Sequence, residues 1–357
     1  MLAVAFGPPA SLRLVGLIAL SDPPRADSAR LISELKTLGV ETVMVTGDAP
    51  ATAAIVAGEV GLNGPTCPQG PIPETVKPDE YSVFASILPE GKFNLVKAFQ
   101  KNGYTVGMCG DGANDAPALR QAQIGIAVST ATDVAKSAAG VVLTEAGLSG
   151  IVAAIKTGRL IFQRILSYTL RSTTKKIAQI LLLAFGLLMT GQAVLTPLLM
   201  VIVMISGDFL SMAFATDRVR PSEDPNSWDI GKITAAGVAL GLMFLSFCVA
   251  ILAVGKYKMH LDIDHLRTFC VISVVYGSQA ITYAVRDRQH LWGLRPTGWL
   301  VMSSTAEMLF ISVLANRGIE MSSLSVRVLC LEFLAATAFY LVLNLAKIPV
   351  FRRLHIT

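Results

Sequence analysis

The sequence predicts an α/β domain built on a parallel sheet, followed by an all-α membrane domain of about six transmembrane helices. The first observation is composition. The 357 residues are 53% hydrophobic and 15% charged, with a mean hydropathy of +0.58, whereas soluble domains carry about 25% charged residues. The second is distribution: charges mix with short apolar runs over 21–160, while 177–345 holds long apolar stretches with charges between them. A soluble domain followed by a membrane domain explains both.

The soluble part alternates short apolar strands with amphipathic helices. The expected strands are Leu14–Leu20, Val40–Val45, Val83–Ile87, Tyr104–Cys109, Ile124–Val128 and Val141–Leu143. The expected helices are Ser28–Leu38, Pro50–Val60, Pro89–Gln100, Asp115–Ala122 and Thr132–Ser137. Strands that are apolar throughout and alternate with helices indicate a parallel sheet covered on both faces.

Three loops after these strands carry polar residues where a ligand is expected, because such sheets bind ligands beyond the carboxyl ends of their strands. They are Asp22–Arg25, Thr46–Asp48 and Gly110–Pro117. The third holds two glycines, which let the backbone approach a ligand closely, and two carboxylates with an amide between them. These are hard oxygen ligands suited to magnesium, which binds carboxylates together with phosphate oxygens. An isolated Asp-Gly pair indicates only a turn, but the complete loop favours a ligand site.

These loops resemble motifs of the P-type ATPases. Gly110–Pro117 is similar to the hinge signature of that family, and Thr46–Asp48 to its second phosphorylation-domain motif, with Lys92 in the expected order between them. Phe162–Arg164 and Asp217–Arg218 narrow the resemblance to the proton-pumping, plasma-membrane H⁺-ATPase-like subfamily, of which this chain resembles the C-terminal half. The resemblance implies a haloacid dehalogenase-like phosphorylation domain that uses ATP and Mg²⁺.

Residue roles follow from the resemblance, position by position. Asp111 would coordinate Mg²⁺, with Asp115 as second ligand or structural partner. Thr46 and Asn114 would hydrogen-bond the transferred phosphoryl group, and Lys92 would neutralise its charge. Such a set fits phosphoryl transfer, which depends on positioning and on electrostatic stabilisation by a metal and a lysine.

Gly47 and Asp48 complete the Thr46 motif and are counted with the catalytic loop.

Two further motifs of the family are absent from the sequence. No Asp is followed by Lys, so the Asp-Lys-Thr-Gly-Thr nucleophile loop is not in this chain, and the Thr-Gly-Glu of the actuator domain is absent too. Because an aspartyl phosphate couples hydrolysis to a change of shape, we expect this chain alone neither to be phosphorylated nor to transport. The expected segments are 1–20, the tail of the nucleotide-binding domain with a return strand; 21–160, the phosphorylation domain; 161–345, the membrane domain; and 346–357, a cytoplasmic tail.

The membrane domain is expected to place the soluble domain in the cytoplasm. Its spans are predicted near 171–190, 194–216, 233–254, 266–285, 299–315 and 326–345. Basic residues gather in the loops on the side of the soluble domain. The lipid bilayer, with the plasma membrane as its setting, is therefore an expected partner.

Charged residues within spans are candidates for ion transport, because their burial is costly. Asp208 is the strongest, since the matching aspartate of the proton-pumping subfamily takes up and releases the proton, although Gly207 stands where the subfamily usually has Asn. Glu307 and Glu332 are interpreted as structural. Lys175 is interpreted, with its neighbour Lys176, as marking the cytoplasmic end of the first span.

Several functions stay open at this point. The favoured function is the C-terminal half of an ATP-driven cation pump, with the proton as the expected cation. A separately encoded N-terminal half would complete it, or it is left incomplete. The alternative is a non-enzymatic remnant, or a membrane-bound regulator or partner of an intact pump. A free-standing phosphatase would need Asp-x-Asp at the sheet, and Asp262–Asp264 lies far from it in the sequence. No basic cluster is interleaved with aromatics, which disfavours a nucleic-acid partner, and the five cysteines show no zinc spacing.

Overall fold

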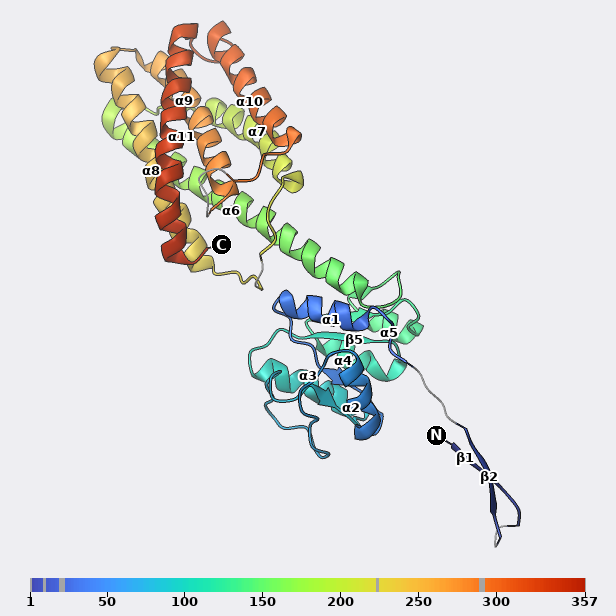
Figure 1. The fold of residues 1–357 in the computed structure, drawn as a ribbon. Helices are drawn as coiled ribbons and strands as arrows, with labels where there is room; N and C mark the ends of the chain where they lie inside the picture. Colours follow the sequence, from blue (N-terminus) through green and yellow to red (C-terminus); the bar gives the residue numbers. More distant parts are fainter. Residues whose placement is uncertain (1, 9–10, 19–22, 223–224, 289–292, 357) are drawn as a thin grey trace. The chain divides into compact units, whose positions relative to one another are not determined.

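The computed structural model describes residues 2–8, 11–18, 23–222, 225–288 and 293–356. They form two compact units, the first reaching to Lys156 and the second beginning at Thr157, with Pro225 assigned to the first. The first unit contains β1 (Leu2–Phe6), β2 (Arg13–Ile18), α1 (Ser28–Thr37), β3 (Met44–Val45), α2 (Pro50–Glu59), β4 (Val83–Phe84), α3 (Pro89–Lys101), β5 (Gly107–Gly110), the 3₁₀ turn η1 (Ala113–Asp115), α4 (Ala116–Gln121), β6 (Ile124–Ala127), α5 (Asp133–Ala138) and β7 (Val141–Val142) (Figure 1).

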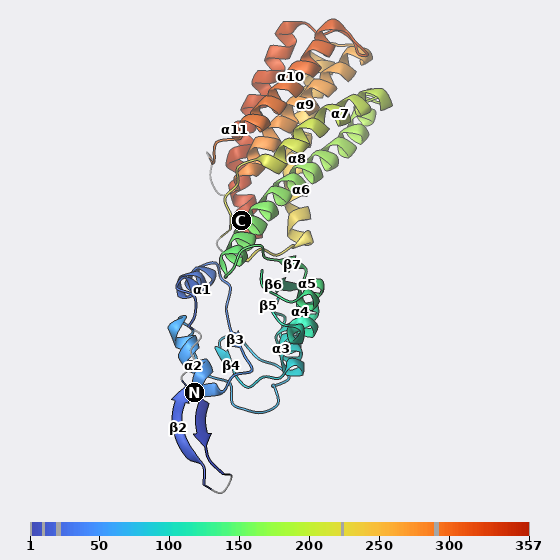
Figure 2. The ribbon, with the colours of Figure 1, turned by 90° about the vertical axis from the view of Figure 1, so that its right-hand side faces the viewer.

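The parallel sheet predicted from the sequence is confirmed, but it consists of two pieces. β3 pairs in parallel with β4, and β5, β6 and β7 form a parallel sheet in that order. Among the described residues no ladder joins β3 to β5, so each of these strands has one unpaired edge. Figure 2 shows β3 and β4 apart from the group β5, β6 and β7.

Helices cover the two pieces. α2 packs on β3 and β4 through Ala53 and Ala57. α3 buries Leu95 and Phe99 in a cluster that includes Val45 of β3 and Val106 just before β5, so this helix contacts both pieces of sheet. α4 and α5 cover β5 and β6 through a cluster of Leu119, Ala127, Ala131 and Ala135, against which Met108 packs.

The strand expected at Leu14–Leu20 does not join the parallel sheet. Its described part is β2, which pairs antiparallel with β1 as a hairpin, and Ala19 and Leu20 lie outside the described residues. Every residue of β2 is exposed. Alternation with helices indicates parallel pairing only when a helix separates consecutive strands. The segment 7–12 between β1 and β2 is too short for such a crossover.

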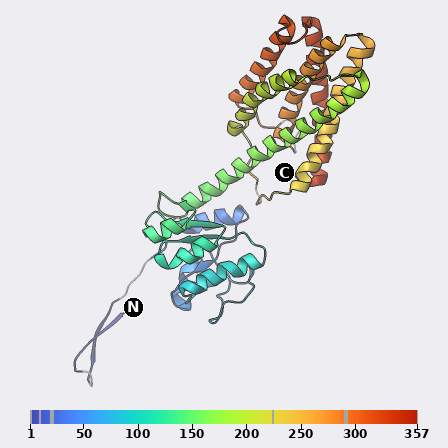
Figure 3. The same cartoon turned by 180° about the vertical axis from the view of Figure 1, so that it is seen from behind.

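The second unit is helical. It contains most of α6 (Ser149–Thr190), then α7 (Pro197–Ala213), the 3₁₀ turn η2 (Phe214–Thr216), α8 (Ile230–Ala253), the π turn η3 (Val254–Lys258), α9 (Ile263–Arg286), α10 (Gly298–Arg317) and α11 (Val326–Leu354) (Figure 3, green to red). By length and composition, six helices in the described part of the chain could cross a membrane, as the sequence predicts. α9 is the central one, since 94% of its most apolar window is buried within the protein.

Candidate functional site

The Thr46–Asp48 loop, which follows β3, is bonded to the loop that follows β4. The backbone N–H of Ile87 donates to the Thr46 carbonyl at 3.0 Å, and that of Ser86 donates to the Asp48 carbonyl at 2.8 Å. Within the first loop the Thr46 hydroxyl donates to Asp48 Oδ2 at 2.8 Å and accepts from the Asp48 N–H at 3.1 Å. The carboxyl ends of both strands therefore meet, with Asp48 exposed and its neighbour Gly47 exposed beside it.

The third loop closes around the buried side chain of Asp115. Its Oδ2 accepts from the backbone N–H groups of Asp111 and Gly112, each at 3.2 Å. A methyl group at Gly110 would lie only 2.6 Å from the Asp115 Cβ, so the loop can close in this way only with glycine at 110. The Asp111 carboxylate and the Asn114 side chain stay exposed at the surface of the loop.

Lys92 links the segment that follows β4 to the Gly110–Pro117 loop. It lies in the first turns of α3, which follows β4, and its Nζ donates to Asp115 Oδ1 at 2.7 Å. The contact is well shielded, since the side chains are 19% and 6% exposed. Through this ion pair and the bonds of Ile87 and Ser86, the loops after β3, β4 and β5 gather at one edge of the α/β unit.

The loop at Asp22–Arg25 is also expected at this edge. Its first residue, Asp22, lies outside the described residues.

Some backbone N–H groups of β3 and β5 point toward the unpaired edges of these two strands. Met44 and Thr46 donate their N–H groups to the carbonyls of Ser82 and Phe84, so by the alternation of a strand the N–H of Val45 points the other way. Ile124 and Val128 donate to the carbonyls of Val106 and Gly110, so in β5 the N–H groups of Gly107 and Cys109 belong to the opposite edge. Central strands of a parallel sheet are normally buried on both faces, yet Gly107 and Cys109 are exposed.

The residues at this edge can hold magnesium in one way. The Asp111 carboxylate is exposed and accepts no hydrogen bond from the described residues, whereas both oxygens of Asp115 are engaged by Lys92 and by backbone N–H groups. One carboxylate with phosphate oxygens and waters is an ordinary magnesium set. Asp111 therefore fits a metal ligand, and Asp115 fits the structural partner that holds the loop. No group of three or more acidic, His or Cys side chains forms a metal cluster in the described part of the chain.

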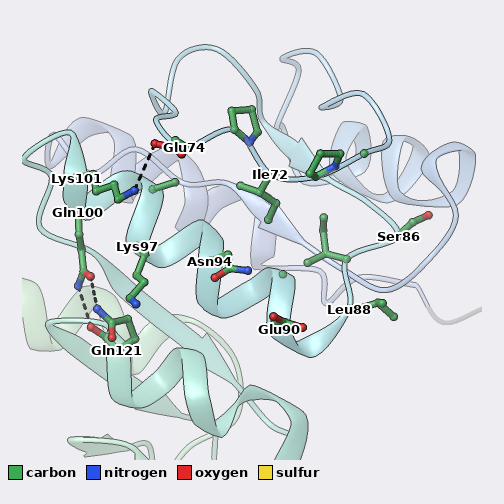
Figure 4. A pocket seen from close by; sticks show the side chains of 16 residues that line it. Ile72, Glu74, Ser86, Leu88, Glu90, Asn94, Lys97, Gln100, Lys101 and Gln121 are labelled. Carbon is green, nitrogen blue, oxygen red and sulfur yellow. Dashed lines mark hydrogen bonds and ion pairs between the residues drawn. The ribbon is translucent and has the colours of Figure 1, made fainter.

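A separate groove of about 860 Å³ lies beside α3 (Figure 4). Its lining includes Ile72, Asn94, Lys97, Gln100 and Gln121. Lys101 and Glu74 pair across 3.7 Å at its rim. None of the predicted site residues lines it, but Ser86 and Ile87 of the loop after β4 do, so it adjoins the edge that carries the three loops.

In the helical unit Asp208 does not lie among the buried polar residues. It is exposed on α7. Buried polar side chains and the half-buried Lys175 gather instead around its neighbour Gly207: Arg171 and Lys175 from α6, Gln279 and Thr282 from α9, and Glu307 from α10. Sequence reasoning did not bring them together, because they come from three helices that are far apart in the chain.

Lys175 also departs from its interpretation as the end of a span. α6 runs without a break from Ser149 to Thr190, and the Lys175 ammonium group lies beside the middle of α7, near the Val203 carbonyl at 3.5 Å. Its neighbour Lys176 is exposed. The two lysines thus lie on different faces of one helix.

The Asp217–Arg218 motif occupies a buried ion-pair cluster. The Asp217 side chain is 1% exposed and pairs with Arg286, whose Nη2 donates at 3.1 Å. The Thr297 N–H donates to the same carboxylate at 3.2 Å, and Arg164 Nε donates to the Asp217 carbonyl at 2.9 Å. These contacts join α6, α7, α9 and α10. Arg164 and Asp217 therefore have a structural role in holding these helices together.

Comparisons with known proteins agree with this architecture. Residues 2–123 match the haloacid dehalogenase-like hydrolase family, and residues 92–155 match a second family of the same description. The chain is 32% identical over 354 residues to a Methanocaldococcus jannaschii protein named "Putative cation-transporting ATPase". The match covers 96% of this chain and 44% of that relative, so the chain spans less than half of its length. These findings support the resemblance to P-type ATPases. They do not distinguish the proton-pumping subfamily from other cation pumps. The chain joins a haloacid dehalogenase-like domain to a helical part that holds six candidate membrane helices.

Proposed function

We propose that this chain is part of an ATP-driven cation pump of the P-type, working through an aspartyl phosphate. The observation that carries the proposal is the gathering of three loops, with Asp111, Lys92 and Thr46, at one edge of a haloacid dehalogenase-like domain whose chain continues into six candidate membrane helices. The similarity to a protein named as a cation-transporting ATPase supports it.

The chemistry proposed for this edge is the handling of one phosphoryl group. When bound, Mg²⁺ would supply positive charge to the phosphate oxygens. Asp111 would hold the metal, and Asp115 would keep the loop and the Lys92 ammonium group in position. Thr46 and Asn114 would donate hydrogen bonds to the phosphoryl oxygens, for which the Thr46 hydroxyl must turn away from Asp48. Such positioning and charge neutralisation is what phosphoryl transfer requires.

The nucleophile of this proposal comes from outside the 357 residues. The unpaired edges of β3 and β5 support a strand between them, parallel to both, whose carboxyl end would lie between the Thr46 and Asp111 loops. A strand with Asp-Lys-Thr-Gly-Thr at that end would present its aspartate to the same phosphoryl group. It would come from an N-terminal segment of a longer chain or from a separately encoded half.

The transported cation is proposed to be the proton. The support is the resemblance of Phe162–Arg164 and Asp217–Arg218 to the proton-pumping subfamily, together with Asp208 on α7. The exposure of Asp208 supports a further membrane segment packed against this face of α7, because a carboxylate facing lipid is costly. The soluble unit would lie in the cytoplasm and the helices in the plasma membrane.

A second candidate is a non-enzymatic remnant or a membrane-bound partner of an intact pump. The two-piece sheet favours it, because a chain that stays in this state cannot form an aspartyl phosphate.

One experiment separates the two candidates. The chain is expressed alone and together with the polypeptide encoded immediately upstream, and membranes are treated with radiolabelled ATP and Mg²⁺. If the chain is part of a pump, we expect vanadate-sensitive, hydroxylamine-labile phosphorylation only in the co-expressed sample. Asp111→Asn should reduce this phosphorylation at least about 100-fold. Absence of phosphorylation from the co-expressed sample would contradict the pump and favour the non-enzymatic remnant.

A further inference from the structure

Glu332 is a carboxyl group buried on α11, outside the group of residues around Gly207. It is 3% exposed, and neither of its two carboxyl oxygens has a hydrogen-bond partner within the described residues. One turn to either side, Leu329 and Ala336 belong to the hydrophobic core of the helical unit. Glu332 therefore lies in an apolar core with no hydrogen bond to stabilise a charge.

The helices packed against α11 are α9 and α8. Phe333, which follows Glu332, packs edge-on against Tyr276 of α9, with ring centroids 6.1 Å apart. Further along α11, Phe339 stacks on Phe247 of α8 at 4.7 Å. The surroundings of Glu332 are therefore set by two neighbouring helices and not by lipid.

The titratable groups that interact electrostatically with Glu332 are two thiols and a phenol. They are Cys248 on α8, and Cys270 and Tyr276 on α9. Both cysteines are buried, and the Tyr276 hydroxyl is already paired with that of Ser312 at 2.7 Å. Within the described part of the chain, no lysine or arginine forms an ion pair with Glu332 or acts on its charge. Thiols are weak hydrogen-bond donors and do not replace a counter-charge.

Glu332 is also far from the ends of its helix. It and Cys270 each lie roughly 10 Å along the helix axis from the first residues of α11 and α9. An ionised carboxylate at such a place has neither water nor a cation beside it, and a buried charge without a partner gives way to the neutral form. The neutral form of a carboxyl group carries a proton.

We propose that Glu332 is a proton-binding site of the helical unit, separate from Asp208 on α7, and that its bound proton lets α11 pack against α8 and α9. The ligand is a proton and not a metal ion, because no group of three or more acidic, His or Cys side chains in the described residues could hold a metal. The inference goes beyond the proposed pump function, since this proton is bound whether or not the chain transports a cation.

The first test is labelling of the full chain in lipid nanodiscs at pH 7 with dicyclohexylcarbodiimide, a lipid-soluble reagent for protonated carboxyl groups. The carboxyl oxygen bonds the central carbon of the reagent, and the carboxyl proton passes to one of its nitrogens. The product rearranges to a stable N-acylurea that keeps every atom of both partners. Mass spectrometry of peptides should place this adduct on Glu332.

A water-soluble carbodiimide is the contrasting reagent. It should label Glu332 at least about 10-fold less than the lipid-soluble one, because the residue is enclosed in an apolar core. Glu320 is the matched control, since it is an exposed carboxyl in the loop before α11. Its preference for the two reagents should be the reverse.

The second test compares the infrared spectra of the original chain and of Glu332→Gln, whose side chain is neutral and has nearly the same shape. At pH 7 the difference should contain the carbonyl band of one protonated carboxyl group, and this band should shift when D₂O replaces H₂O. The Tm of Glu332→Gln should stay within roughly 3 °C of the original. Glu332→Ala, which leaves a cavity, should lower the Tm by roughly 5 °C or more.

The proposal is overturned if the difference spectrum lacks the band of a protonated carboxyl group, or if the lipid-soluble reagent leaves Glu332 unmodified. It is also overturned if Glu332→Gln lowers the Tm as much as Glu332→Ala, because the neutral isostere would then not replace the native group. Should Glu332→Gln fail to fold, labelling of the original chain decides alone. Neither test needs nucleotide or phosphorylation, so a failure here is distinct from failure of the proposed pump function.

Discussion

The loop edge of the first unit and the polar cluster of the helical unit hold their charged groups in different ways. At the loop edge, Asp115 is satisfied on both oxygens by Lys92 and two backbone N–H groups, so the site is rigid before any ligand arrives. In the helical cluster, Glu307 has one satisfied and one unpaired oxygen, and Lys175 stands nearby without an ion pair. The first arrangement suits fixed positioning of a phosphoryl group. The second leaves buried polar atoms without a partner.

The largest effect is expected at the fully paired carboxylate of the helical unit. Asp217→Ala would leave Arg286, itself 8% exposed, without its counter-charge, and removal of one partner of a buried pair costs about 3–5 kcal/mol. Thermal unfolding of the chain in nanodiscs measures this loss. Arg218→Ala, a change of the neighbouring residue, is the control. An unchanged Tm for Asp217→Ala would show that the ion pair does not hold these helices together.

A somewhat smaller loss is expected at the loop edge. Asp115→Ala removes the acceptor of two backbone N–H groups and of Lys92, and should cost about 2–3 kcal/mol. Hydrogen exchange of the 110–116 segment should then accelerate, whereas Asp111→Ala, which changes an exposed carboxylate of the same loop, should leave exchange nearly as it was. Equal acceleration in both variants would contradict the assignment of Asp115 as the residue that holds the loop.

Substitutions of Glu307 and Asp208 should differ clearly in their effect on stability. Glu307→Ala loses the Gln279 hydrogen bond and removes the carboxylate that faces Arg171 and Lys175 at Gly207, which should cost roughly 2 kcal/mol. Asp208→Ala should stay within about 0.5 kcal/mol, because the side chain is exposed. Thermal unfolding compares the two, and a larger effect for Asp208 would reverse the contrast.

The smallest effect concerns an exposed pair that joins α1 to the start of α6. A hydrogen bond from Lys156 is the main cause that lowers the pKa of Glu34 below 4.5, with Coulombic attraction to Lys156 and Arg30 adding to it. A carboxyl whose pKa is lower in the folded protein stabilises it above the unfolded pKa, and this contribution is lost as the pH falls. Lys156→Met should therefore reduce protection of α1 slightly at pH 7 and less at pH 4, by hydrogen exchange. Equal loss at both pH values would exclude this linkage.

The sequence predicted the loop edge better than the helical cluster, for a physical reason. Thr46–Asp48 and Gly110–Pro117 are contiguous motifs, and the parallel sheet brings their strand ends to one edge, so local pattern and fold point the same way. In the helices, which faces meet depends on packing angles between segments far apart in the chain. Asp208 was therefore predicted from its mid-span position and its match to the subfamily's aspartate, while the gathering of Arg171, Gln279 and Glu307 appears only in three dimensions.

Two features of the fold could not be predicted from the pattern of apolar runs. The division of the parallel sheet depends on which strands are neighbours, and strand order is not encoded in the alternation of strands and helices. The β1–β2 hairpin has the same apolar character as a buried strand but is exposed. Its apolar residues, Val15 and Leu17 among them, indicate a surface that further chain would cover.

The central claim is that β3 and β5 border the place of one parallel strand, with the three loops at its carboxyl end. The most direct measurement is hydrogen exchange of the full chain with and without a peptide that carries an apolar strand followed by Asp-Lys-Thr-Gly-Thr. The account predicts that the backbone N–H groups of Val45, Gly107 and Cys109 become at least about 10-fold better protected when the peptide binds, since each would gain a ladder hydrogen bond. A scrambled peptide should have no effect. Unchanged exchange at all three positions under conditions where the peptide is bound, or protection confined to residues outside β3 and β5, would contradict it.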